Sequence, residues 1–277
     1  MIDPELQKQL RERFNPEDSD LRRMQLRMLD MLKYIDRICQ ENDIKYWLSS
    51  GTCLGAVRHG GFIPWDDDCD IELEKKDFQK LRKILKSKNS KFILQEHSTD
   101  NEYVAPYAKL RDPSSYLKET NNNDIQYKYN GIYVDIFCIE PSSSLIISKI
   151  SSYIQSYFVY PMSRIKNSFV RENCKKFIVP IIHNALFPIL SMFGRVNNRD
   201  WYRHIPGSGF LKRRYKKDFE KIKYSKFEDV CLPIPQNAEN YLTRIYGDFE
   251  KIPPISSIAP HIIKVCFLAK SDKQTVY

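Results

Sequence analysis

The segment "PWDDDCDIEL", residues 64–73, places four acidic side chains within five positions: Asp66, Asp67, Asp68 and Asp70. Like charges this close repel one another, yet the apolar residues of a buried strand follow at once. Residues i, i+2 and i+4 of an extended strand face the same side. Asp66, Asp68 and Asp70 are therefore expected to share one face if the strand begins early enough, and Asp67 is expected to point away and to tolerate substitution.

Carboxylates that converge on one face raise each other's pKa, and a bound divalent cation reverses that cost. Ligand sets made only of oxygen favour Mg²⁺ or Mn²⁺, and Mg²⁺ is commonly held by one or two carboxylates together with substrate phosphates. Asp68 and Asp70 are the best-placed pair for such a site. A solvated loop end is the alternative, whereas a calcium-binding EF-hand loop is discounted because its later Gly and Glu are missing.

A second acidic residue of interest lies in the segment "GIYVDIFCIE", residues 131–140, which predicts a buried strand. Asp135 is the one charge within its apolar run, and burying a lone carboxylate is costly unless it is paired or bound to a metal. Two interpretations remain open from the residues alone. Asp135 is either a hydrogen-bonded aspartate at a sheet edge or a third metal ligand on a strand beside Asp68 and Asp70.

The segment "LSSGTCLGAVRHG", residues 48–60, predicts a tight turn at Gly51 followed by a short helix. Ser50 and Thr52 supply hydroxyl groups, and the free N–H groups of a helix N-terminus favour an anion. Arg58 follows one to two turns later. An ordinary helix cap is the alternative interpretation of this turn.

The remaining pattern predicts an α/β (α+β) fold with a mixed sheet and flanking helices. Apolar residues at spacings of three and four predict a helix over 21–39. Short helices are predicted at 52–58 and 75–88. Short strands are predicted at 44–50, 69–74, 91–96, 105–112 and 114–119, which gives the order β-α-β-α-β-β-β, and a further strand is predicted at 131–140. We expect a catalytic core over 20–140 and a mostly helical, basic part over 145–277 that wraps it, together forming a single domain, 1–277.

Charge is distributed unevenly along the 277 residues, whose net charge is +9. Residues 1–144 hold 22 Lys/Arg and 25 Asp/Glu, a balance of −3, whereas residues 145–277 hold 22 and 10, a balance of +12. A basic half indicates an anionic partner such as a nucleotide, a phosphorylated polymer or an anionic membrane surface. Ordinary solubilising charge is the alternative.

The apolar segment 177–193 is short for a membrane span and contains Pro180 and Pro188. We expect a buried or interfacial helix pair there, and peripheral membrane contact stays open. Seven scattered cysteines without a C-x-x-C pair fit a reducing cytoplasm. The N-terminal residues lack the apolar stretch of a secretory signal.

In combination these motifs make the chain similar to a known family. It resembles the LicD family, whose best-known members are phosphocholine transferases. That family also resembles fukutin-related proteins and belongs to the wider nucleotidyltransferase fold. Four segments carry the resemblance, with His261 beyond them: "GTCLGAVRHGGFIPWDDDCDIEL" (51–73), "AKLRD" (108–112), "GIYVDIF" (131–137) and "YLTRIYGDF" (241–249).

The resemblance implies a metal-binding pair at Asp68 and Asp70, with Asp135 as the third carboxylate. Gly51 and Thr52 match the family's phosphate-binding turn. Asp66 matches a family aspartate that acts as a ligand, a base or a positioning group. The chain departs from its relatives at Ser50, where they often have Gly or Asp, and at Cys138 and Glu140, where many have Pro and Asp.

Two basic residues complete the set that we expect around the donor. Lys109 and Arg111 alternate on one strand face and are candidates for contacts with donor phosphates, with a solvated strand edge as the alternative. Arg58 is placed in the same donor-binding group. Asp135 or Asp66 is the favoured general base, and His59 is the less favoured one.

The activity implied is transfer of phosphocholine, or a related substituted phosphate, from a CDP-linked donor such as CDP-choline to a hydroxyl of a cell-surface glycan or teichoic-acid precursor. The acceptor is expected to be lipid-linked, the released product CMP, and the location cytoplasmic at or near the inner face of the membrane. The alternatives are a nucleotidyltransferase that releases pyrophosphate and a transferase of ribitol or glycerol phosphate. A nucleic-acid-binding protein is discounted because its sequence signatures are missing.

Overall fold

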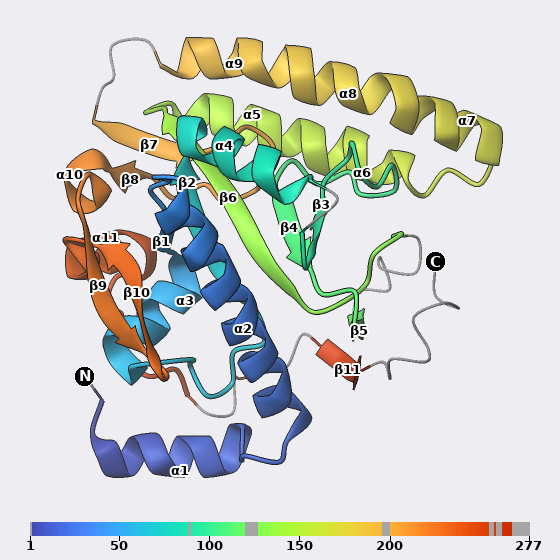
Figure 1. The fold of residues 1–277 in the computed structure, drawn as a ribbon. Helices are drawn as coiled ribbons and strands as arrows, with labels where there is room; N and C mark the ends of the chain where they lie inside the picture. The colour runs from blue at the N-terminus through green and yellow to red at the C-terminus, as the bar shows by residue number, and fades with distance from the viewer. Residues whose placement is uncertain are drawn as a thin grey trace.

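A mixed β-sheet forms the centre of the molecule (Figure 1). Five strands lie side by side in this order: β1 (Trp47–Leu48), β2 (Asp70–Glu74), β6 (Tyr133–Pro141), β4 (Ala108–Arg111) and β3 (Ile93–Gln95). β2 and β6 are parallel, and the other described pairs of this sheet are antiparallel. This computed structural model describes residues 2–87, 90–119, 127–195, 200–254, 258 and 262–267, and it confirms the mixed α/β fold.

Helix α2 (Asp20–Glu41) covers the apolar core beside the sheet. Its buried side chains recur at spacings of three and four, as an amphipathic helix requires: Met24, Met28, Met31, Leu32, Ile35 and Ile38. The Ser19 hydroxyl caps its first turn by accepting a hydrogen bond from the backbone N–H of Arg22. The helix predicted over 21–39 is therefore confirmed, and α4 (Lys75–Leu85) confirms the one predicted over 75–88. Helix α1 (Pro4–Phe14) was not predicted.

The turn at Gly51 leads into α3 (Ser50–Leu54), which continues as a π-helical turn over Gly55–His59. This helix ends at Gly60, whose φ of 64° lies in the left-handed region that favours glycine. At Gly55 a Cβ atom would stand 2.4 Å from the Gly61 carbonyl oxygen. Only glycine at position 55 allows the loop that carries the aspartates to fold back onto the helix.

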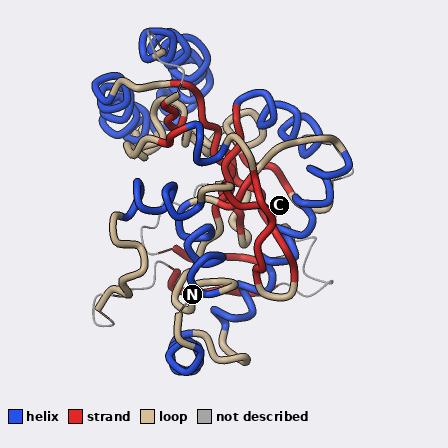
Figure 2. The backbone as a smooth tube through the Cα atoms, turned by 90° about the vertical axis from the view of Figure 1, so that its left-hand side faces the viewer, coloured by secondary structure: helices blue, strands red, loops and turns tan. Residues whose placement is uncertain are grey.

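Two long helices follow β6 and lie side by side along one side of the molecule (Figures 1 and 2). We call residues 145–194 the helical hairpin. Its inner helix consists of α5 (Leu145–Ile154), a π turn (Gln155–Val159) and α6 (Tyr160–Met162). Its outer helix consists of five consecutive segments: α7 (Ser168–Asn173), a π turn (Cys174–Ile178), α8 (Val179–Ile181), a π turn (Ile182–Leu186) and α9 (Phe187–Gly194).

The prolines of the hairpin do not interrupt its helices, contrary to the expected helix pair over 177–193. Pro161, Pro180 and Pro188 each follow a π turn by two residues. Proline lacks an N–H and its ring clashes with the carbonyl of residue i−4, and a π turn widens the helix locally. We attribute the unbroken outer helix to this arrangement.

The expectation that residues 145–277 are mostly helical holds only for the hairpin. Five strands follow it: β7 (Trp201–His204), β8 (Arg214–Tyr215), β9 (Ile222–Phe227), β10 (Val230–Pro235) and β11 (Ile262–Phe267). β7 joins the central sheet beside β6, β9 and β10 form a two-stranded ribbon, and β11 pairs with β5 (Ser115–Glu119). β10 contains Pro233 and Pro235, which a two-stranded ribbon tolerates because it has free edges.

Candidate active site

A cavity of about 1150 Å³ lies where the turn at Gly51, the aspartate segment and the C-terminal half meet. Ser50, Gly51, Asp66, Asp68 and Asp70 line one side of it. Basic side chains line the other side: Lys149, Arg203, Lys212, Arg213, Arg214 and Arg244. A single cavity therefore brings together an acidic side from the first half of the chain and a basic side from the +12 half.

The acidic side has the alternation that the sequence predicts. Asp66, Asp68 and Asp70 line the cavity, whereas Asp67 and Cys69 do not and are 6% and 0% exposed. Strand β2 begins only at Asp70, so the alternation continues through the preceding loop. The three carboxylates line the same cavity, although the strand expected to align them begins too late to include Asp66 and Asp68.

Short contacts to the Gly51 turn fix the aspartate segment. The backbone N–H of Asp70 donates to Thr52 Oγ1 at 2.8 Å, and the N–H of Ser49 donates to the Asp70 carbonyl oxygen at 3.0 Å. A Cβ atom on Gly51 would stand 2.9 Å from Asp66 Oδ2. Thr52 therefore positions Asp70 through its backbone, and Gly51 leaves the space that the Asp66 carboxylate fills.

The carboxylates of this segment are electrostatically unfavourable when they stand alone. Burial and the neighbouring Asp68 raise the pKa of Asp66 well above its usual value. Burial, Asp68 and Asp135 raise the pKa of Asp70 in the same way, while Lys109 opposes the rise. Carboxylates crowded in this manner bind a proton or a cation more readily than isolated ones.

Asp135 lies on the strand next to Asp70, and the two are direct partners in the parallel pairing of β2 with β6. On its other side Asp135 is the partner of Lys109 on β4. The Lys109 ammonium forms an ion pair with Asp135 Oδ1 at 2.9 Å and lies 3.3 Å from the centre of the Tyr133 ring. Asp135 is thus beside the carboxylate cluster, and a lysine neutralises its charge.

The basic side is held in place by a buried glutamate that we had not predicted as a site residue. Glu72 of β2 accepts hydrogen bonds from Arg214, at 2.6 and 2.9 Å, and from His204 at 2.6 Å. Trp47 and Tyr241 also donate to it. Burial raises the pKa of Glu72, but Arg214 and His204 outweigh it and bring the value to about 2. Glu72 therefore stays charged and fixes Arg214 in the cavity wall.

The family model described as "LicD/FKTN/FKRP, nucleotidyltransferase domain" matches residues 43–178. The chain contains a LicD-family nucleotidyltransferase domain. The matched range holds the Gly51 turn, the aspartate segment and Asp135, and it ends inside the helical hairpin.

Curated relatives extend the likeness beyond the LicD domain model. The lipopolysaccharide cholinephosphotransferase LicD of Haemophilus influenzae is 24% identical over 277 residues, which cover 90% of this chain and 98% of the relative. The human ribitol 5-phosphate transferase FKRP is 40% identical over 45 residues, 16% of this chain and 9% of the relative. Mannosyltransferase regulator 4 of Saccharomyces cerevisiae is 22% identical over 264 residues, covering 88% and 22%.

Four of the predicted donor-binding residues of the LicD domain lie outside the cavity lining: Thr52, Arg58, Lys109 and Arg111. Arg58 donates to the Phe249 carbonyl oxygen at 2.8 Å and to the Lys251 carbonyl oxygen at 3.3 Å, so it holds the 249–251 segment. Arg111 is 1% exposed and donates to Gln95 Oε1 at 2.7 Å and to the Gly131 carbonyl oxygen at 2.8 Å. Neither guanidinium lines the cavity.

Lys109 and His59 can be placed in the same way. Lys109 and Arg111 are both buried and both lie over the Tyr133 ring, which excludes the solvated-edge interpretation. Burial and Arg58 lower the pKa of His59 to about 3, and His59 does not line the cavity, so it is poorly placed as a general base. The family residue His261 lies outside the described residues.

The carboxylates of the LicD domain fit a cation whose remaining ligands come from the substrate. Within the described residues, no group of three or more His, Cys, Asp or Glu side chains is arranged to hold a metal ion. Asp68 and Asp70 offer two oxygen ligands on one side of the cavity, and Asp135 is engaged by Lys109. Two carboxylates together with substrate phosphates are a common environment for Mg²⁺.

Proposed function

We propose that this protein transfers phosphocholine, or a related substituted phosphate, from a CDP-linked donor to a hydroxyl of a glycan and releases CMP. The observation that carries this proposal is the single cavity lined by Asp66, Asp68 and Asp70 together with six Lys and Arg side chains. An acidic side can hold a cation and a basic side can bind phosphate oxygens. A diphosphate-linked donor requires both.

Asp68 and Asp70 are the residues proposed to hold Mg²⁺ or Mn²⁺, with Asp135 next to them. When bound, such a cation neutralises diphosphate charge and stabilises the leaving group. Arg203 and Arg213 are proposed to bind the donor phosphates, because Glu72 and the Lys212 carbonyl oxygen already engage the Arg214 guanidinium. Burial and the neighbouring Arg213 and Arg214 lower the pKa of Arg203, so a phosphate bound among these residues would relieve their mutual repulsion.

Asp66 is the group that we propose as general base, because it lines the cavity beside the proposed metal ligands. In the reaction, the acceptor hydroxyl gives its proton to Asp66. The acceptor oxygen forms a bond to the phosphorus that carries the head group, and the bond between that phosphorus and the CMP oxygen breaks. Asp135 is the weaker candidate because Lys109 neutralises it.

An aromatic cluster favours choline as the head group. Phe210 lines the cavity and is 46% exposed. Its ring centre lies 5.0 Å from that of Phe137 and 6.5 Å from that of Tyr107. Quaternary ammonium groups bind over the faces of aromatic rings, whereas ribitol and glycerol gain little from them. The Haemophilus relative is named as a cholinephosphotransferase, which agrees with this choice.

The proposal is tested by assaying the protein with Mg²⁺, a panel of glycan acceptors and one donor at a time. The donors are CDP-choline, CDP-ribitol, CDP-glycerol and, separately, CTP with a sugar phosphate. We expect CMP release to be fastest with CDP-choline and to stop when the metal is chelated. Pyrophosphate release from CTP in place of CMP release from any CDP-linked donor would overturn the proposal in favour of a nucleotidyltransferase.

A further inference from the structure

The helical hairpin, residues 145–194, concentrates the exposed apolar surface of the molecule. Fourteen of the nineteen large apolar side chains that are exposed in the described residues belong to it. They are Leu145, Ile146, Ile150, Tyr153, Tyr157, Phe158, Phe169, Val170, Phe177, Ile178, Ile181, Ile189, Met192 and Phe193. Soluble proteins rarely leave so much apolar surface in one region without a binding partner.

These side chains follow helical spacing on both helices. On the inner helix, Ile146, Ile150, Tyr153 and Tyr157 recur at intervals of four and three. On the outer helix, the exposed residues Ile178, Ile181, Ala185, Ile189 and Met192 recur at intervals of three and four. Each helix therefore presents an apolar stripe to its surroundings in addition to the side that packs inward.

The charges of the hairpin are almost all positive. It carries six basic residues and one acidic residue, Glu172. The basic residues are Lys149, Arg164, Lys166, Arg171, Lys175 and Lys176. Apolar and aromatic stripes combined with lysine and arginine are typical of helices that lie in the surface of an anionic bilayer. We propose that the helical hairpin binds the surface of a membrane that contains anionic lipids.

The outer helix, Ser168–Gly194, is also long and apolar enough by composition to cross a membrane, but its inward contacts favour a position at the surface. Lys175 is buried and forms an ion pair with Glu102. His97 Nε2 lies 2.9 Å from the Lys175 carbonyl oxygen, and His183 Nε2 lies 2.9 Å from Gln155 Oε1. A spanning helix would break these contacts and move a lysine into lipid.

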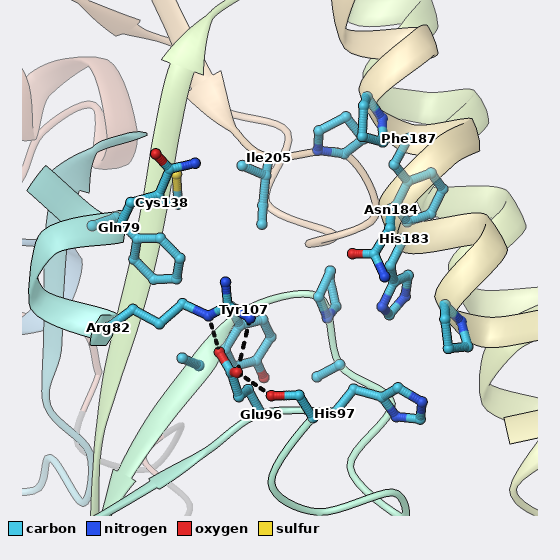
Figure 3. Close-up of a pocket in the computed structure, with 18 of the residues that line it drawn as sticks. Gln79, Arg82, Glu96, His97, Tyr107, Cys138, His183, Asn184, Phe187 and Ile205 are labelled. Carbon is cyan, nitrogen blue, oxygen red and sulfur yellow. Dashed lines mark hydrogen bonds and ion pairs between the residues drawn. The ribbon is translucent and has the colours of Figure 1, made fainter. Parts of the chain in front are cut away.

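Figure 3 shows what the inward side of this helix faces. His183, Asn184 and Phe187 point from the outer helix into a cavity of about 470 Å³, opposite Gln79 and Arg82 of α4. Burial lowers the pKa of His183 to about 4, so it is neutral at physiological pH. His183 and Asn184 of the outer helix are therefore directed at this cavity, whereas its apolar stripe is left for the lipid surface.

Membrane binding at the hairpin has a consequence for the proposed reaction, and this step rests on the proposed function. Leu145 and Lys149 of α5 line the carboxylate cavity, and Ile146 and Ile150 of the same helix are exposed. A bilayer that covers the hairpin therefore reaches the rim of the cavity. This placement suits a lipid-linked acceptor, whose hydroxyl would enter the cavity from the membrane surface.

The surface is tested by sedimenting the full-length protein with vesicles of phosphatidylcholine, with and without phosphatidylglycerol. We expect binding only when phosphatidylglycerol is present and a loss of binding in the double variant Ile181→Asp/Met192→Asp. Leu26→Asp is the matched control, because Leu26 is an exposed leucine of α2 outside the hairpin. Lys176→Glu is expected to weaken binding by about fivefold or more, since each basic residue near an anionic surface contributes roughly that factor.

Three outcomes would overturn the proposal: equal binding to vesicles without phosphatidylglycerol, no vesicle binding at all, or resistance to extraction at alkaline pH, which indicates a spanning helix. A dimer that dissociates in the double variant would assign the hairpin to a second copy instead.

CMP release with a water-soluble acceptor separates this proposal from the proposed function. The double variant is expected to retain that release, whereas a failed function would abolish it in the unsubstituted protein as well.

Discussion

Asp70 and Asp135 are direct partners in the parallel pairing of β2 with β6, so two acidic side chains lie on adjacent strands, although only Asp70 of the two lines the cavity. Their repulsion is partly offset by Lys109, which forms an ion pair with Asp135 at 2.9 Å. This relationship makes the carboxylate cluster dependent on a positive charge. In the proposed reaction a bound metal ion supplies a second positive charge.

Replacing Lys109 by Met is expected to lower stability without metal, because it leaves Asp135 uncompensated. Breaking a buried ion pair costs about 3–5 kcal/mol, and both side chains are about one-tenth exposed. Added Mg²⁺ should then raise the melting temperature more in this variant than in the wild type. Thermal melting with and without Mg²⁺ measures both effects, with Lys80→Met as an exposed control. An identical Mg²⁺ shift in all three proteins would contradict the coupling.

The Glu72→Gln substitution is expected to destabilise the fold by roughly 3–5 kcal/mol, because the buried Arg214 would lose its counter-charge. The same substitution at Glu74 on the same strand serves as the control. Glu74 pairs with Lys45 at a partly exposed site, so about 1 kcal/mol or less is expected there. Urea unfolding measures both values. Equal losses in the two variants would show that the Glu72 network does not hold the cavity wall.

Gly51→Ala is expected to displace the Asp66 carboxylate, whose Oδ2 lies 2.9 Å from the position of the new Cβ atom. A displaced catalytic group reduces kcat by roughly 10–100-fold, which the rate of CMP release at saturating donor measures. If Gly51 acts through Asp66, the double variant Gly51→Ala/Asp66→Asn should be no slower than Asp66→Asn alone. Fully additive losses would assign Gly51 a separate role.

Acidification is expected to destabilise the protein partly through His59. Arg58 Nε donates to His59 Nε2 at 2.9 Å, so Nε2 is the acceptor and the folded ring is neutral. Its pKa is about 3 when folded and about 6.5 when unfolded. Between these values the unfolded chain binds a proton that the folded chain does not, so stability falls as pH falls.

His59→Gln removes this contribution, while the carboxylates that also titrate in this range are unchanged. From pH 7 to pH 5 the wild type should lose up to about 2 kcal/mol more than the variant. Urea unfolding at both pH values gives the difference. Parallel losses in the two proteins would show that folding does not lower the pKa of His59.

Local periodicity was sufficient to predict the elements that carry the acidic side. The alternation of Asp66, Asp68 and Asp70 and the apolar run around Asp135 depend only on neighbours in the sequence. The strands that follow the hairpin were missed because Pro233 and Pro235 resemble loop residues, and an edge strand tolerates them. Pro180 and Pro188 misled in the opposite way, because π turns accommodate them within a helix.

The basic side of the cavity depends on contacts between distant parts of the chain. Glu72 and Arg214 are separated by 142 positions, and no local pattern indicates that they meet. The position of Glu72 between Ile71 and Leu73 was the one available signal. Arg58 and Arg111 were grouped with the donor-binding residues because of their charge, but the structure commits each to backbone carbonyl groups.

The account as a whole depends on the acidic side of the cavity, and one comparison tests it most directly. Mg²⁺-dependent release of CMP from CDP-choline is measured for the wild type and for Asp68→Asn, Asp70→Asn and Asp67→Asn. We predict a loss of at least 100-fold for Asp68→Asn and Asp70→Asn, on the order expected when a charge-stabilising group is removed. Asp67→Asn, outside the cavity, should retain activity. Full activity in the Asp68 and Asp70 variants would contradict the account.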